Sequence, residues 1–140
     1  MGMTHQNSQA TLHRAYQLLI SDLDRAFPLR GSSDEVRALV WEPVAQSCII
    51  WLLRQVLSRH ECDDLVLPVE ALRDIARSAC RDDAFAHRIG LNRRRTRKAL
   101  ALGCAVLCSD LFAVPSVLIR QGDRFTIERT SEGLLVKSHF

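Results

Sequence analysis

The chain has little glycine and little proline, six and four among 140 residues, and it contains no internal repeat or low-complexity tract. Collagen-like, repeat and linker-rich architectures are therefore excluded. Hydrophobic residues make up 47% of the sequence and charged residues 25%, which is a globular composition. Because a chain of this length can bury a core of ordinary size, we expect residues 1–140 to form a single domain.

Long hydrophobic runs are also absent. The longest strongly apolar stretch, residues 48–53, ends at Arg54, whereas a membrane-spanning helix needs roughly 18 to 20 apolar residues. The first nine residues are mostly polar and lack the basic-then-apolar order of a signal peptide. The sequence thus predicts no membrane contact and a cytoplasmic protein.

Motifs that hold metals or phosphates are missing as well. The five cysteines are odd in number, and neither Cys-x-x-Cys nor His-x-x-x-His spacing occurs. Residues 60–64 contain several metal-ligand types that Cys104 and Cys108 could join, but free cysteines more often pack in a core. No glycine-rich phosphate loop and no local signature of a catalytic cysteine or carboxylate pair is present. We therefore expect no disulfide framework, no metal, no cofactor and no enzymatic activity.

Helical periodicity covers the first three quarters of the chain. Pro28 ends the first predicted helix, and Pro43 should kink or divide the second. Residues 44–57 are apolar on most faces, so we expect them to be the buried centre of the domain. Helices are predicted over residues 8–27, 33–57, 68–79, 84–89 and 92–107.

From residue 114 the periodicity changes to alternation. Gln121-Gly122-Asp123 and Ser131-Glu132-Gly133 have turn composition and separate short alternating runs. Strands are predicted over residues 117–120, 124–129 and 134–138. The expected fold is mainly α, a compact helical domain with a short C-terminal antiparallel β-hairpin or meander.

Charge is distributed unevenly along the sequence. The net charge is +3, yet no acidic residue lies between Asp83 and Asp110. Six cations lie in that interval, so subtracting six from +3 leaves the rest of the chain at −3. Cations in the first turn of a helix oppose its macrodipole and repel one another, and a bound polyanion would relieve both. The six are Arg88, Arg93, Arg94, Arg95, Arg97 and Lys98.

Residues 84–103 resemble a helix-turn-helix. That motif needs a small residue where two helices cross and a residue tolerant of positive φ in the turn, and Ala86 and Gly90 stand at the expected spacing. Thr96 is a departure, because it stands where the family usually has a branched aliphatic residue. The apolar residues that can pin both helices to the core are Phe85, Ile89, Leu91, Ala99 and Leu100.

With the C-terminal strands as a wing, the resemblance extends to winged-helix DNA-binding regulators. It implies that the second helix of the motif enters the major groove of double-stranded DNA. The cations of the strands, Arg120, Arg124, Arg129 and Lys137, would then reach the DNA backbone. The candidate nucleic-acid-binding residues are Arg88, Asn92, Arg93, Arg94, Arg95, Thr96, Arg97, Lys98 and Arg124.

The predicted function is that of a DNA-binding transcriptional regulator. Residues 8–60 would be its helical core and a possible homodimer interface, with Trp41 and Trp51 as anchors for either contact. Residues 68–140 would be the helix-turn-helix-like part with its hairpin.

The alternative is a non-enzymatic protein–protein interaction module, an adaptor, antagonist or accessory factor that docks an acidic partner through the same basic helix. The two functions differ in geometry. In the regulator, residues 93–98 project from a helix that lies free on one face, beside the hairpin. In the interaction module, residues 8–27 partly cover that helix, or it is too short to enter a groove.

Overall fold

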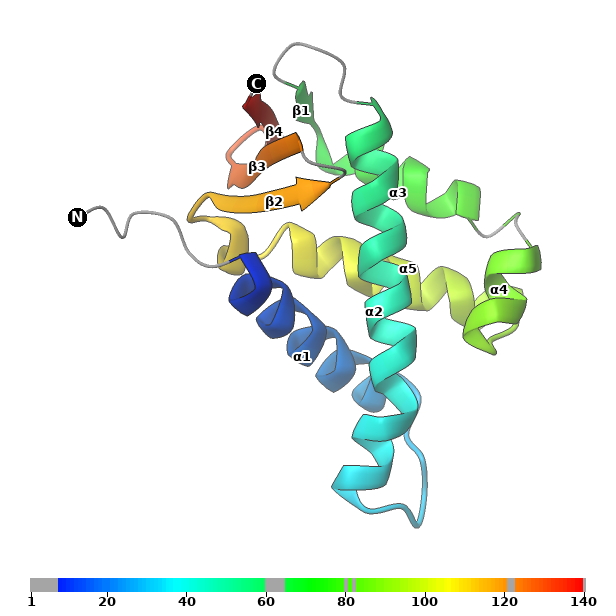
Figure 1. Ribbon diagram of the computed structural model, residues 1–140. Helices are drawn as coiled ribbons and strands as arrows, with labels where there is room; N and C mark the ends of the chain where they lie inside the picture. The colour runs from blue at the N-terminus through cyan, green and yellow to red at the C-terminus, as the bar shows by residue number, and fades with distance from the viewer. Residues whose placement is uncertain (1–7, 60–64, 80, 82, 121–122, 140) are drawn as a thin grey trace.

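The computed structural model describes residues 8–59, 65–79, 81, 83–120 and 123–139. Five α-helices and a four-stranded antiparallel sheet make up this part of the chain (Figure 1). The helices are α1 (Ser8–Ala26), α2 (Asp34–Arg59), α3 (Val69–Ala79), α4 (Asp83–Ile89) and α5 (Arg93–Leu107), and a short 3₁₀ turn, η1 (Asp110–Phe112), follows them. The strands are β1 (Leu65–Leu67), β2 (Ser116–Arg120), β3 (Asp123–Thr130) and β4 (Gly133–His139). A mainly α fold with a C-terminal β-meander is as predicted.

Two helices share the centre of the molecule. Helix α5 crosses behind α2 in Figure 1 and packs against α1, α2 and α3. The crossing with α2 is close, because a Cβ added to Gly103 would lie 2.9 Å from Cδ1 of Leu52. Residues 44–57 bury one face in this core, but Ile50 is 37% exposed. The sequence therefore identified one of the two central helices and overlooked the other.

Helix α2 continues through Pro43, so of the two predicted effects of this proline, a kink or a division into two helices, the division does not occur. Proline leaves the carbonyl of the residue four positions earlier without its helical hydrogen bond. That residue is Leu39, which is 69% exposed, so water can satisfy the carbonyl. By length and composition alone residues 34–58 could cross a membrane, but a core helix passes the same test, and the buried residues of α2 belong to the hydrophobic core.

Strand β1 was not predicted. It pairs antiparallel with β4, with Leu67 opposite Leu134, and gives the sheet order β1-β4-β3-β2. The side chains of Leu67, Leu134 and Val136 are buried beside the helical core. Three residues are too few for an alternating pattern to be recognised, and the strand forms because a partner distant in sequence is present. The other three strands lie within a residue or two of their predicted bounds.

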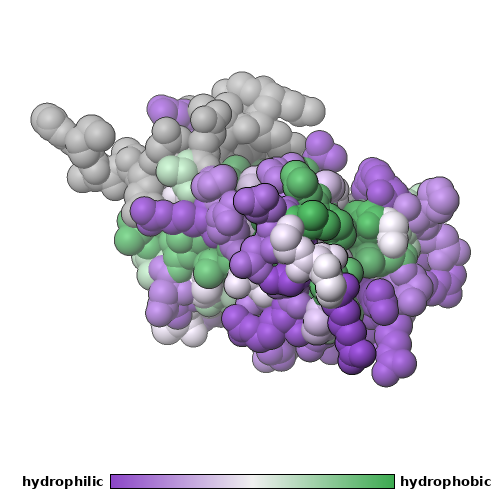
Figure 2. All heavy atoms as spheres, turned by 90° about the horizontal axis from the view of Figure 1, so that it is seen from below, coloured by the Kyte–Doolittle hydropathy of each residue, from purple (hydrophilic) through white to green (hydrophobic). Residues whose placement is uncertain are grey.

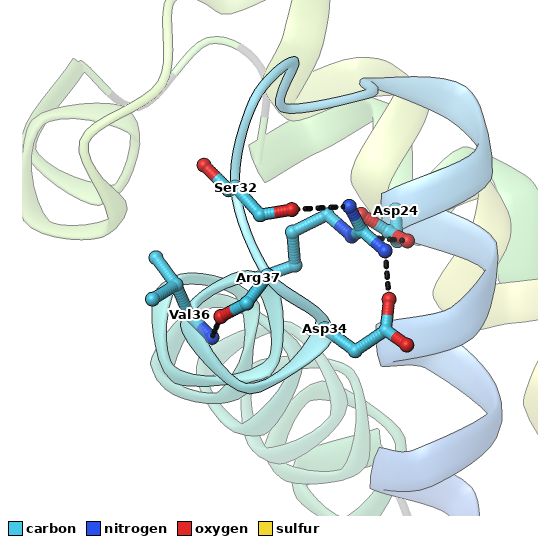
Figure 3. Close-up of polar contacts among 6 residues, drawn as sticks. Asp24, Ser32, Asp34, Val36 and Arg37 are labelled. Carbon is cyan, nitrogen blue, oxygen red and sulfur yellow. Dashed lines mark hydrogen bonds and ion pairs between the residues drawn. The ribbon is translucent and has the colours of Figure 1, made fainter.

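An arginine joins the first two helices at their connecting loop. Arg37 of α2 donates to the carbonyl oxygen of Ser32 at 2.7 Å and to the carboxylate of Asp34, and its Nε lies 3.3 Å from Oδ2 of Asp24 in α1 (Figure 3). Oδ1 of Asp24 is buried and accepts no hydrogen bond from the described residues. Arg37 thus supplies a cation to the partly buried carboxylate of Asp24 and links the start of α2 to α1.

Gly133 begins β4 with a φ of +140°, and a Cβ there would lie 2.1 Å from the carbonyl oxygen of Leu67. We expect Gly133→Ala to lower the free energy of unfolding by about 3 kcal/mol or more, because β1 and β4 must separate to admit the methyl group. Gly90→Ala is the matched control, since Gly90 has a φ of +74° but open space around its added Cβ. It should cost only the left-handed backbone penalty of about 1–2 kcal/mol. Urea unfolding that gives equal losses for both variants would contradict the close approach at Gly133.

Arg37→Ala should lower the free energy of unfolding by about 1–2 kcal/mol, because it leaves the carboxylate of Asp24 without its cation. The side chains of Arg37 and Asp24 are 28% and 34% exposed, so solvent screens part of the loss. As a control, Arg25→Ala removes a weaker pair with Asp22, at 3.9 Å and with Arg25 79% exposed. It should cost under about 0.5 kcal/mol in the same thermal or urea experiment.

Candidate nucleic-acid interface

The predicted helix-turn-helix segment folds as two helices joined by a tight turn. Gly90 has a φ of +74°, the left-handed conformation expected of it. The N–H of Leu91 donates to the carbonyl of Ala86 at 3.1 Å, which closes the end of α4. Asn92 caps α5, because its Oδ1 accepts from the N–H of Arg95 at 2.8 Å. The local geometry of residues 83–95 was therefore predicted correctly.

Thr96 belongs to the core. Its side chain is fully buried, and its hydroxyl donates a long hydrogen bond of 3.5 Å to the carbonyl of Leu91. The prediction that Thr96 contacts nucleic acid is therefore wrong. Thr96 lies on the buried side of α5, with Ala99 and Leu100.

Three of the six cations are held by neighbouring side chains. Nε and Nη2 of Arg93 donate to the two carboxylate oxygens of Asp83 at 2.7 and 2.8 Å. Arg88 lies over the ring of Phe85 at 5.3 Å, and Arg95 lies over the ring of Phe27 at 5.4 Å. Each of these guanidinium groups thus has a side-chain neighbour, but all three side chains remain exposed.

The other three cations, Arg94, Arg97 and Lys98, are exposed in the first two turns of α5. No ion pair between described residues includes them. Since the first turn of α5 contains no acidic residue, their charge is not neutralised locally. We call these three residues the basic face.

A surface hollow of about 520 Å³ opens beside the basic face. It is lined by Arg77 of α3, Arg81 after α3, and Arg93, Arg94 and Arg97 of α5; we call it the arginine hollow. Nη1 of Arg77 pairs with Asp74 at 2.7 Å, whereas Arg81 has no ion-pair partner among the described residues. Sequence reasoning missed Arg77 and Arg81. Their spacing of four residues at the end of α3 was the available signal, but only packing brings them to α5.

The surroundings of α5 show one feature of each of the two geometries expected from the sequence. Its first turns are exposed, as in the regulator. However, α1 packs along α5 and Phe27 lies under Arg95, as in the interaction module. The sheet lies near the C-terminal end of α5 and η1, whereas the basic face is at the end near α4 (Figure 1).

The cations of the strands are not grouped with the basic face. Nη2 of Arg129 pairs with Asp110 at 2.8 Å, next to η1. Arg124 and Lys137 are exposed, and the side chain of Arg120 lies outside the described part of the chain. Contact of Arg124 with DNA remains a prediction.

The two tryptophans, candidates for a core or dimer contact, pack within the chain. Trp41 is 3% exposed and its ring lies 5.8 Å from that of Phe27. Trp51 is partly buried against the ring of Phe85 at 5.6 Å. Both rings therefore contribute to the packing of α2 within the chain.

The described cysteines, Cys48, Cys104 and Cys108, are free thiols. Burial raises the pKa of Cys48 and of Cys104 to about 12, so both are protonated at neutral pH. Sγ of Cys104 donates to the carbonyl of Leu72 at 3.7 Å, a core contact. Within the described residues no cluster of three metal-ligand side chains occurs, and the candidate ligands His60 and Cys62 lie outside that part.

Asn92→Ala should lower the free energy of unfolding by about 1 kcal/mol, since the N–H of Arg95 loses its acceptor. Asn92→Asp is the matched control. An aspartate keeps the capping oxygen and suits the helix N-terminus, so stability should be retained. Equal stability of the alanine variant and the wild type in urea would contradict the cap.

Comparisons with known proteins found nothing similar to this chain. No protein-family model matches it, and neither does any curated protein or solved structure. A proposal for its function therefore depends on the contacts and charges of residues 77–98.

Proposed function

We propose that this protein binds double-stranded DNA through the basic face of α5 and acts as a transcriptional regulator. The observation that supports this most is the exposure of Arg94, Arg97 and Lys98 on a helix whose start is fixed by a cap and a tight turn. Because α5 is held by the core on its opposite side, these cations keep a defined spacing. A rigid array of cations suits the regular spacing of phosphates on a duplex.

Electrostatics favours a phosphate ligand over a solvated surface. The helix N-terminus has a partial positive charge, so cations there are destabilised by the macrodipole and by one another. At such a position a phosphate group can accept hydrogen bonds from backbone N–H groups and from guanidinium groups. Release of condensed counterions from DNA would then supply most of the affinity.

A homodimer remains a prediction within this proposal, since regulators of this kind usually bind as two-fold dimers. The N-terminal turns of α2, which point downward in Figure 1, have exposed apolar side chains at Val36, Leu39 and Val40. Apolar atoms are visible among the hydrophilic ones on this underside (Figure 2). Concentration-dependent sedimentation is the direct test of the oligomeric state.

The second candidate function is docking of an acidic protein surface through the same residues. The cover of α5 by α1 favours it, because a helix enclosed on one side is harder to insert deeply into a groove. The two functions share the basic face, and they differ in whether DNA binds at moderate salt.

Fluorescence anisotropy of a labelled duplex across a salt series tests the proposal. We expect Arg94→Ala/Arg97→Ala/Lys98→Ala to weaken binding and to flatten the slope of log K against log salt by about 0.9 for each phosphate that the variant no longer neutralises. The matched control is Arg14→Ala/Arg25→Ala/Arg30→Ala, which removes three exposed cations from α1 and the loop after it. It makes the same change in net charge, so it should leave the slope near that of the wild type.

Absence of binding to any duplex at low salt by the folded wild-type protein would overturn DNA binding. Equal weakening by the two triple variants would show a response to net charge alone, and would overturn the assignment to α5. In the first case the acidic protein partner becomes the leading function.

A further inference from the structure

The arginine hollow shares Arg94 and Arg97 with the basic face, and it adds Arg77, Arg81 and Arg93 to them. Its five lining residues are all arginines, and they come from two helices and a turn separated by up to 20 positions in the sequence. Its volume of about 520 Å³ lies within the usual range for small-ligand sites. Such sites are normally lined by apolar and aromatic side chains, which are not among those lining this hollow. An aromatic or apolar ligand is therefore a poor match.

We propose that the arginine hollow is a binding site for an anion with adjacent phosphate groups, an oligophosphate. A guanidinium group presents planar, paired N–H donors that match the oxygens of a phosphate group. Several guanidinium groups around one concavity can donate to the oxygens of two neighbouring phosphates at once. They offer more donors than a single phosphate group could accept. The phosphates can belong to a free oligophosphate or to a nucleic-acid strand, and in the latter case the inference rests on the proposed DNA binding.

Two aspartates already accept hydrogen bonds from two of these arginines. Asp83 accepts both Nε and Nη2 of Arg93, and Asp74 accepts Nη1 of Arg77. All four side chains of these pairs are at least 66% exposed, so the pairs contribute little to stability and a multivalent anion can exchange with them.

Asp83 is the stronger of the two internal competitors because its pair with Arg93 is bidentate. The hydrogen bonds and the charge of Arg93 hold the pKa of Asp83 below its usual value of 3.8. Asp83 is therefore ionised at neutral pH. Removal of its charge should release Arg93 to the ligand and strengthen binding.

Isothermal titration of tripolyphosphate into the full chain at low salt tests the site. We expect Arg77→Gln/Arg81→Gln to weaken binding by about tenfold or more, because two guanidinium groups that would donate to the phosphates are removed. The matched control is Arg14→Gln/Arg30→Gln, which removes two exposed arginines elsewhere and should change affinity less than about twofold. Asp83→Asn should tighten binding several-fold, because asparagine keeps the size of the side chain and removes its charge. Circular dichroism verifies that each variant is folded.

Three results would overturn the inference. The first is the absence of saturable tripolyphosphate binding by the wild-type protein. The second is binding that responds equally to the hollow and control variants, and the third is binding that Asp83→Asn leaves unchanged. Because Asp83→Asn is expected to strengthen binding, a failure to fold cannot imitate its effect.

Competition with a labelled duplex distinguishes the two sources of phosphate. Displacement of DNA by tripolyphosphate, with weaker DNA binding by Arg77→Gln/Arg81→Gln, would support the hollow as part of the DNA surface. Tripolyphosphate binding by a protein that binds no duplex would support a free oligophosphate as ligand, and would contradict only the proposed function. DNA binding without tripolyphosphate binding would contradict only the inference.

Discussion

The arrangement of the whole molecule depends on how α5 is packed. Its apolar side, with Leu100 and Leu107 fully buried, lies against α1, α2 and α3. Burial of that side supplies the hydrophobic stabilisation, and it fixes the rotation of the helix about its own axis. The rotation in turn decides that Arg94, Arg97 and Lys98 face solvent while Thr96 faces the core. The position of the cations is thus a consequence of core packing.

The same packing makes the surface at the start of α5 more strongly basic than the sequence segment of α5 alone would make it. Helix α3 lies against α5, which brings Arg77 and Arg81 to the first turns of α5. Repulsion among these guanidinium groups opposes the approach, and the pairs with Asp74 and Asp83 reduce it. The aspartates of these pairs are exposed, so they are accessible to exchange with another anion, as proposed for the arginine hollow.

The location of the sheet bears on the resemblance to winged-helix proteins, because the strands lie away from the basic face. Strand β1 pairs with β4 at one edge of the sheet, where Gly133 permits the approach of Leu67. Strand β3 contacts η1, and its Arg129 pairs there with Asp110. A DNA surface centred on the basic face would therefore use α3 as its neighbouring element, and the strands would stabilise the other end of the domain.

Much of the local structure follows from the sequence alone. The caps and turns, such as Asn92 and Gly90, depend on side chains within four residues of each other, and the periodicity of α1, α3 and α5 depends on a single apolar side. The tertiary structure decided everything that depends on contacts between distant segments. Strand β1 exists because β4 is beside it, Pro43 is accommodated because its side of α2 faces solvent, and Thr96 is buried because of how α5 is rotated. The sequence determined that a concentrated positive charge exists near residue 95, but only packing determined which cations are paired, which are exposed, and that Arg77 and Arg81 join them.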